Sequence, residues 1–254
     1  MSNLRFYSAE TLKIGATIKL SDNAATHATR VMRLNVGDAL TLFYGDGFDY
    51  PCELISVKKS EVLAQVKSSQ KVDNESNLNI TLLQGISAGD RMDISIQKAV
   101  ELGVNRIIPI KTERSVVKLD EEKAKKRVEH WQNVVIAACE QSGRAKIPQV
   151  FAPESLPAWL GTNIHAASRE GDLTSEPKTR ILLNPIGAKK LRELQKPEGE
   201  IELLIGAEGG LSDKEIALAL SQEFQSIVLG GRILRTETAP LAAIAAMQTL
   251  WGDF

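Results

Sequence analysis

The segment from Leu229 to Ala239 concentrates side chains that can carry charge or form hydrogen bonds. An apolar run ends there in Gly230 and Gly231, and two arginines, two threonines and a glutamate follow before an alanine-rich helix is expected. A loop that only connects two elements rarely needs so many polar groups. In open α/β sheets, ligands bind at the carboxyl ends of the strands. We therefore expect this segment to bind a ligand.

A second candidate segment lies at residues 203–212, where an apolar strand runs into a glycine-rich turn. Ser212 and Glu215 predict a capping box at the start of the next helix. Glycines permit close approach of the backbone to a ligand, although a tight turn that needs glycine only for its geometry is the more ordinary interpretation. The turn is neither a GxGxxG motif nor a phosphate-binding loop with its Lys-Ser/Thr.

The elements that position these segments belong to the second of two expected domains. Residues 1–72 show short alternating strands and a Gly45-Asp46-Gly47 turn, which predict a small β-barrel, with a short helix capped by Ser21 running toward Leu34. Residues 73–254 alternate apolar runs with amphipathic helices and predict an α/β domain with a mostly parallel sheet. Strands are expected at 79–84, 106–110, 181–183, 201–205 and 226–229, and helices at 90–102, at 121–141, and from Ser212 and Thr238.

The bulk properties narrow the range of partners. The formal net charge of -1 means that a polyanion must meet a local basic patch. Cys52 and Cys139 are isolated, and the three histidines show no zinc-type spacing, so we expect a reducing compartment and no metal site. We see neither a signal-peptide core at the start nor a stretch that could span a membrane, and we expect a cytoplasmic protein.

The motifs together resemble one family. IGAEGGLS at 205–212 and LGGRILRTETA at 229–239 resemble the C-terminal signature of the small-subunit ribosomal RNA (uracil-N3) methyltransferases of the SPOUT superfamily. The likeness extends to GDRMD at 89–93, KAVELGV at 98–104, ERS at 113–115 and EQSGR at 140–144. In the first domain, HATRVMR at 27–33 and VGD at 36–38 resemble the family's PUA-like RNA-binding module. Ala207 departs from the family, which usually has proline there, and this alters the stiffness of the turn more than its chemistry.

The resemblance implies a trefoil-knotted SPOUT domain after a PUA-like β-barrel, with methylation of N3 of a uridine in 16S rRNA of the small ribosomal subunit. The methyl donor would be S-adenosylmethionine, held by three loops of the knot in a mostly apolar pocket. Carried over residue by residue, these loops supply Leu183, Asn184, Pro185, Ile205, Gly206, Glu208, Gly209, Gly210, Leu229, Gly230, Ile233, Leu234, Thr236, Thr238 and Ala239.

The implied chemistry is a direct methyl transfer to a ring nitrogen that carries a proton near neutral pH. That proton must be removed, or the developing anion stabilised. Arg235 and Glu237 are the leading candidates, and Glu208 and Arg144 are secondary ones. An ion pair between Arg235 and Glu237 that only braces the loop is almost as good an interpretation. No Cys or Ser nucleophile with a nearby base is recognisable in the sequence, in agreement with transfer in one step.

Several arginines are candidates for contact with the RNA. Arg30 and Arg33 lie three apart on a predicted helix and would face the same way, and Arg5 could join them at phosphates. A solvated helix face is the commoner explanation for such a pair. Arg114 and Arg144, which we expect in loops, are further candidates. His27 is expected in the core rather than in a groove.

The resemblance also implies a homodimer, since SPOUT domains usually pair. The expected helix from Pro240 places Leu241, Ala242, Ala245, Ala246 and Thr249 on one small-residue face. Small side chains let helices pack closely, as a symmetric interface requires. The same face could instead pack on the chain's own sheet.

Two other functions fit parts of the pattern. One is a SPOUT methyltransferase that modifies a ribose 2′-hydroxyl or a tRNA base, although such enzymes do not usually carry this N-terminal module. The other is a non-catalytic RNA-binding assembly factor that uses the PUA-like module alone. Identifying the methylated nucleoside separates the first, and a direct measurement of cofactor binding separates the second.

Overall fold

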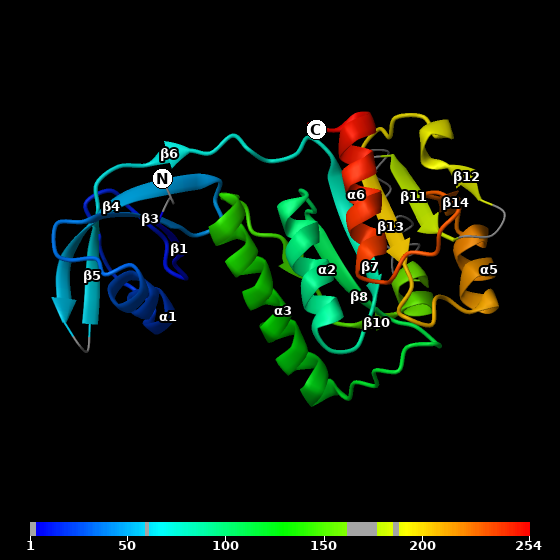
Figure 1. Cartoon of the computed structure of the whole chain (residues 1–254), viewed down its shortest axis with the longest axis horizontal. Helices are drawn as coiled ribbons and strands as arrows, with labels where there is room; N and C mark the ends of the chain where they lie inside the picture. Colours follow the sequence, from blue (N-terminus) through cyan, green and yellow to red (C-terminus); the bar gives the residue numbers. More distant parts are fainter. Residues whose placement is uncertain (1–3, 59–60, 162–176, 185–187) are drawn as a thin grey trace. The chain divides into compact units, whose positions relative to one another are not determined.

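The computed structural model describes residues 4–58, 61–161, 177–184 and 188–254. The chain forms two compact units, one of residues 1–75 with 136–147, the other of residues 76–135 with 148–254 (Figure 1). The first unit therefore takes in a later stretch of the chain, which the predicted division into 1–72 and 73–254 did not include.

The first unit is built on a six-stranded sheet in the order β1 (Arg5–Tyr7), β3 (Ala39–Phe43), β4 (Phe48–Lys58), β5 (Glu61–Val66), β2 (Thr17–Lys19), with β6 (Gln70–Lys71) paired to β4. Gly45 and Gly47 both adopt positive φ, at 99° and 91°, and form the predicted turn between β3 and β4. Alternate strand residues such as Leu42, Leu54 and Ala64 are fully buried in its core, as the period of two predicts.

The helical segment of the first unit ends earlier than the sequence suggested. Ser21 caps α1 (Asp22–Thr26), as predicted, and a π-helical turn η1 (His27–Val31) follows. Arg33 lies beyond it with φ 58°, so the prediction that Arg30 and Arg33 share a helix face is wrong. His27 is exposed, with its ring centroid 5.6 Å from that of Phe6 in an edge-to-face arrangement, and is not the core residue that we expected.

The end of α3 (Glu121–Ser142) and the residues after it are held in the first unit by two buried arginines. Arg5 donates to the carbonyl oxygens of Cys139 (2.7 Å) and Arg144 (3.0 Å) and pairs with Asp49 (2.7 Å). Arg144 pairs with Glu75 at 2.6 Å. Arg5 and Arg144 are 5% and 4% exposed, so the prediction that they contact RNA is wrong: both guanidiniums are used to build the unit. The same burial argues against Arg144 as a catalytic group.

The second unit contains a parallel sheet of eight strands in the order β10 (Glu154–Ser155), β8 (Arg106–Lys111), β7 (Asn79–Gly85), β13 (Glu200–Ile205), β11 (Lys178–Leu183), β14 (Gln225–Val228), β12 (Lys189–Lys190), with β9 (Gln149–Val150) paired to β8. This confirms the expected α/β class and each predicted strand. Because the strands are parallel, their carboxyl ends meet at one edge of the sheet.

Helices cover both faces of this sheet. Ala219 of α5 (Asp213–Ser221) and a helical stretch at 156–161 pack on the face that carries Leu83, Leu182 and Leu204. The helices α2 (Asp90–Glu101) and α6 (Thr238–Trp251) contact each other and lie side by side in Figure 1. The 3-10 turn η2 (Leu191–Glu193) follows β12. Strand residues alternate between the two faces, which explains why nearly all of them are buried.

The edge of the sheet where the strands begin buries a network of ion pairs. Glu202 is 0% exposed and pairs with Arg180 (2.9 Å) and Lys178 (3.2 Å). Glu200, also buried, pairs with Lys178 at 3.2 Å and with Arg106. Each of these carboxylates has two cationic partners, which is what a buried charge requires.

Candidate functional site

A cavity of about 730 Å³ lies at the carboxyl ends of β11, β13 and β14. Its wall includes most of the residues predicted to hold a cofactor, namely Leu183, Asn184, Ile205, Gly206, Glu208, Gly209, Gly210, Leu229, Ile233, Leu234, Thr236 and Ala239. Arg235 and Glu237 line it as well. Gly230 and Thr238 are described but are not part of the wall, and Pro185 lies outside the described residues. The three segments chosen from the sequence therefore meet in one pocket.

The glycines of the turn after β13 are needed for packing within the protein. A Cβ on Gly206 would come within 2.7 Å of the carbonyl carbon of Gly210, and one on Gly209 within 2.9 Å of the Arg114 Cβ. Gly230 adopts φ 131°, where a side chain would be strained even though space is available. Gly206 and Gly209 therefore shape the pocket by letting its walls approach each other.

The hydroxyl of Thr236 joins the third segment to the other walls. It is buried and donates to the Gly206 carbonyl at 3.0 Å. It also accepts from Gln84 Nε2 at 3.3 Å and lies 3.0 Å from the Ser87 hydroxyl. Thr236 was predicted to contact the cofactor. The structure shows its hydroxyl bonded to the protein instead, so that its polar group holds the pocket together.

The two carboxylates of the pocket differ in how they are bonded. Oε1 of Glu208 accepts from the Ala88 backbone N–H at 2.8 Å and from Arg91 at 3.0 Å. Burial alone would raise the pKa of Glu208, but the hydrogen bonds from Ala88 and Arg91 outweigh it and lower that pKa. Glu208 is consequently held as a bonded carboxylate.

Glu237 is the N-cap residue of α6, and its carboxylate is 19% exposed. Its Oε2 is buried, and within the part of the chain that the structure describes it has no hydrogen-bond partner; we call it the open Oε2. Arg91 Nε and Arg235 both lie 4.0 Å from this carboxylate, beyond hydrogen-bond distance. The Arg235 side chain is 82% exposed. A pair so long and so exposed braces the loop little.

Arg91 is a site residue that was not predicted from the sequence. It lines the pocket from the first turn of α2, with 48% of its side chain exposed. The motif at 89–93 was recognised, but nothing in the spacing marks one exposed arginine of a helix as a pocket residue. Arg114, predicted to contact RNA, lines the same pocket, and its side chain is half exposed.

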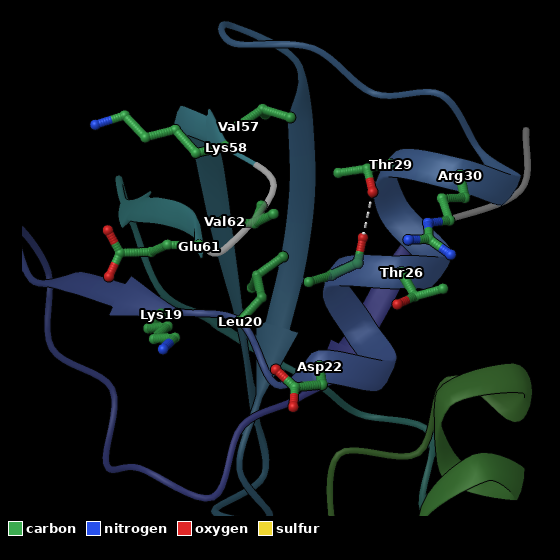
Figure 2. A pocket seen from close by; sticks show the side chains of 11 residues that line it. Lys19, Leu20, Asp22, Thr26, Thr29, Arg30, Val57, Lys58, Glu61 and Val62 are labelled. Carbon is green, nitrogen blue, oxygen red and sulfur yellow. Dashed lines mark hydrogen bonds between the residues drawn. The ribbon is translucent and has the colours of Figure 1, made fainter.

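The first unit has a smaller cleft of about 380 Å³ between the helical segment and strands β4 and β5 (Figure 2). In Figure 2, Thr26, Thr29 and Arg30 come from the helical side, and Lys58, Glu61 and Lys19 from the strands and their ends. The wall carries three cations (Lys19, Arg30, Lys58) and two anions (Asp22, Glu61). Arg30 thus belongs to a polar, mainly basic cleft, whereas Arg33 is exposed outside its wall.

The residues that the structure describes were also considered as a membrane span and as a metal site. No helix there is long and apolar enough to cross a membrane. In the same residues, no group of three or more His, Cys, Asp or Glu side chains is arranged to hold a metal ion.

The chain matches the family described as RNA methyltransferase domain over residues 74–248, and RNA methyltransferase PUA domain over residues 20–67. These two matches agree with the fold and define the class: RNA methyltransferases that carry a PUA domain.

The relatives narrow this class. The chain is 35% identical to the ribosomal RNA small subunit methyltransferase E of Buchnera aphidicola subsp. Schizaphis graminum, over 98% of this chain and 97% of the relative. It is 33% identical to that of Bacillus subtilis, over 93% of each chain. The chain belongs to the ribosomal RNA small subunit methyltransferase E family.

Two solved structures support the same assignment. The Neisseria gonorrhoeae ribosomal RNA small subunit methyltransferase E, bound to S-adenosyl methionine, is 43% identical, with a TM-score of 0.86 over 98% of both chains. A methyltransferase of Legionella pneumophila, in complex with the same cofactor, is 37% identical, with a TM-score of 0.90 over the whole of both chains.

Proposed function

We propose that the protein uses S-adenosylmethionine to methylate N3 of a specific uridine in 16S rRNA of the small ribosomal subunit. Relatives named as small-subunit rRNA methyltransferases support the substrate, and two solved relatives with bound S-adenosylmethionine support the cofactor. The observation that carries the choice of chemistry is the open Oε2 of Glu237 in the pocket wall. A proton acceptor is what methylation of a protonated ring nitrogen requires.

The pocket fits the cofactor by size and chemistry. Its volume of about 730 Å³ lies in the usual range for small-molecule sites, and its wall combines apolar side chains and glycine backbone with a few charged groups. Leu183, Ile205, Leu229 and Leu234 would cover the apolar parts of the cofactor, and the backbone of residues 206–210 would approach its polar parts. When bound, S-adenosylmethionine supplies an electrophilic methyl group.

The residues of the chain then have to bind the uridine and remove its N3 proton. The open Oε2 of Glu237 accepts that proton. Arg235, exposed beside it, stabilises the negative charge that develops on the uracil ring. Glu208 is less suited as the acceptor, because Ala88 and Arg91 already occupy its Oε1 and lower its pKa.

Contact with RNA comes from both units. In the first, Arg30 and its neighbours Lys19 and Lys58 line the basic cleft of Figure 2, which suits a phosphate or a splayed nucleotide. In the second, Arg114 lines the methylation pocket with half of its side chain exposed. Arg33 is exposed and stays a candidate. Such local patches let a chain of net charge -1 bind a polyanion.

We also propose that the protein acts as a homodimer through α6. Ala243, Ile244 and Met247 of this helix are fully buried against its own unit. The predicted interface face, Leu241, Ala242, Ala245, Ala246 and Thr249, is only partly buried or exposed. The chain's own sheet therefore does not cover that face, and it is open to a second copy. Ala242→Glu should give a monomer in sedimentation, whereas a wild-type monomer that methylates normally would contradict the proposal.

The trefoil knot around the pocket stays a prediction from the resemblance, and the cytoplasmic location stays a prediction from the sequence. The substrate assignment is tested by incubating the purified protein with labelled S-adenosylmethionine and small-subunit RNA, assembled subunits or tRNA, and then identifying the labelled nucleoside. We expect 3-methyluridine from small-subunit RNA. A ribose-methylated nucleoside or a labelled tRNA base would support the other SPOUT activity. Failure of the protein to bind the cofactor would favour an assembly factor.

A further inference from the structure

Three segments of the second unit meet at the guanidinium of Arg91. Arg91 belongs to α2, and its NH1 lies 3.0 Å from Glu208, which follows β13. Its Nε lies 4.0 Å from Glu237, which follows β14. All three side chains line the methylation pocket. One side chain thus bridges two carboxylates from two different loops.

The bridge is fixed at the Glu208 end. Oε1 of Glu208 accepts both the Ala88 backbone N–H at 2.8 Å and the Arg91 guanidinium at 3.0 Å. A guanidinium is planar and presents its N–H groups in a rigid fork, so fixing NH1 also fixes the direction of Nε. The Glu208 contact therefore determines where the positive charge of Arg91 lies relative to Glu237.

At its other end, the Arg91 guanidinium makes no hydrogen bond with Glu237. Thr236, the preceding residue, is held through its hydroxyl to Gly206 at 3.0 Å, so the backbone of this loop is in a set position. Only the carboxylate of Glu237 lacks such a bond at Oε2. The charges of Arg91 and Arg235, each at 4.0 Å, compensate its burial without occupying its lone pairs. That arrangement holds the carboxylate in place while the lone pairs of its buried Oε2 stay unbonded within the described residues.

We infer that Arg91 is a positioning residue: held by Glu208, it orients the Glu237 carboxylate so that the open Oε2 faces the uridine N3–H. This rests on the proposed function and adds a residue to it. Arg91 moves no proton itself. Its effect on methyl transfer passes through Glu237, in the way that misplacing a reacting group by a fraction of an ångström slows a reaction.

The test compares Arg91→Ala and Arg91→Lys with Lys98→Ala as a matched control. Lys98 is on the same helix, pairs with Glu101 at 2.8 Å, has 41% of its side chain exposed, and is not in the described pocket wall. We expect Arg91→Ala to lower kcat about 10- to 100-fold with KM for small-subunit RNA nearly unchanged. Arg91→Lys should recover part of this loss, because an ammonium can contact one carboxylate but cannot bridge two. Lys98→Ala should behave as wild type.

A second comparison tests the route through Glu208. Glu208→Gln should lower kcat in the same direction, and the double variant Arg91→Ala/Glu208→Gln should be no slower than Arg91→Ala, because residues that act as one unit are not additive. Calorimetry with S-adenosylmethionine accompanies each variant.

The outcomes separate this inference from the proposed function. Two outcomes would overturn the positioning role and leave the proposed function intact. One is an Arg91→Ala variant with the turnover of wild type. The other is a variant whose loss of turnover is matched by equal losses of cofactor affinity and thermal stability. If the wild-type protein neither binds S-adenosylmethionine nor methylates small-subunit RNA, the proposed function fails first. Retained cofactor affinity with a lowered kcat and partial rescue by lysine would support Arg91 as described.

Discussion

The two edges of the parallel sheet both collect glutamates and arginines, but they use them in opposite ways. At the edge where the strands begin, Glu202 contacts Arg180 and Lys178 at 2.9 and 3.2 Å. At the edge where the strands end, Glu237 has its two arginines at 4.0 Å and keeps the open Oε2. Glu202 is fully buried, and the Glu237 side chain is 19% exposed. The larger difference between the two carboxylates lies in their hydrogen bonds, which are complete at Glu202 and missing at Oε2 of Glu237.

The saturated edge serves the fold. Lys178 stands opposite Glu200, and Arg180 opposite Glu202, in the register between β11 and β13. A slip of one residue would turn these side chains to the other face and leave buried charges without partners. The missing hydrogen bond at Glu237 is costly to the fold, and a ligand that donates to this oxygen would offset that cost. The comparison thus separates the charges that build the protein from those that work on a substrate.

The largest effect is expected for Glu237→Gln. The amide keeps the volume but cannot accept the N3 proton, so the single-turnover rate of methylation should fall about 10²- to 10⁴-fold. The melting temperature should stay close to that of wild type, because the open Oε2 makes no hydrogen bond within the described structure. Glu101→Gln, which changes a glutamate that lies outside the described pocket wall and has 25% of its side chain exposed, serves as the control. A turnover within about twofold of wild type would remove Glu237 from the reaction.

Glu202→Gln, at the edge where the strands begin, should lower the stability of the protein and leave its cofactor binding unchanged. Breaking a buried ion pair typically costs about 3–5 kcal/mol, and we expect the lower part of this range because Glu202 is fully buried but its partner Lys178 is 38% exposed. The loss should appear in the free energy of unfolding measured with urea. The affinity of the folded protein for S-adenosylmethionine, measured below the transition, should be unchanged. A variant as stable as wild type but inactive would reverse the roles assigned to the two edges.

Thr236→Val sharpens the comparison, because the Thr236 hydroxyl lies at the same edge as Glu237 but has all its hydrogen bonds within the protein. The substitution keeps the shape but removes the hydroxyl that donates to the Gly206 carbonyl and accepts from Gln84, whose amide keeps only its bond to the Gly85 carbonyl, at a cost of about 1–3 kcal/mol. We expect lower stability together with severalfold weaker cofactor binding in calorimetry. If both stay at wild-type values, the Thr236 hydroxyl does not hold the loops together.

The smallest effect is a pH dependence at Glu200. Burial by itself would raise the pKa of Glu200, but the hydrogen bond from Thr81 and the charges of Lys178 and Arg106 outweigh it and lower that pKa. A carboxyl group whose pKa is lowered on folding stabilises the protein above its unfolded pKa, about 4.3, and this contribution is lost as the pH falls through the folded pKa.

Glu200→Gln should therefore destabilise the protein by about 1 kcal/mol at pH 7, a modest value because water screens the half-exposed Arg106 and Lys178. The difference from wild type should shrink as the pH is lowered below about 4.3. Urea unfolding at several pH values measures it. A difference that grows toward acid pH would contradict the direction of the pKa shift.

Most of the fold and the place of the site were predictable because they follow from local patterns. The buried positions Met92, Ile96, Ala99 and Val100 of α2 appear in the sequence at helical spacing. The meeting of residues 183–184, 205–210 and 229–239 in one pocket follows from parallel strands whose carboxyl ends share an edge.

What could not be predicted depends on contacts distant in sequence. Arg5 donates to carbonyl groups 134 and 139 residues away, so nothing near it in the chain shows that it is buried. Arg91 occupies an exposed position of an amphipathic helix, where arginine is ordinary, and only its contacts with Glu208 and Glu237 reveal its place in the site. The open Oε2 of Glu237 is a property of geometry alone, since it is defined by the partners that it lacks among the described residues.

The central claim is that the protein methylates N3 of a uridine in the pocket at the carboxyl edge of the sheet, with Glu237 as the proton acceptor. Mass mapping of small-subunit rRNA from cells lacking this protein, with and without complementation, tests it most directly. We predict that one 3-methyluridine disappears, returns with the wild-type protein and with Glu101→Gln, and stays absent with Glu237→Gln present at wild-type levels. An unchanged 16S rRNA in the deleted cells, or full restoration by Glu237→Gln, would contradict the claim.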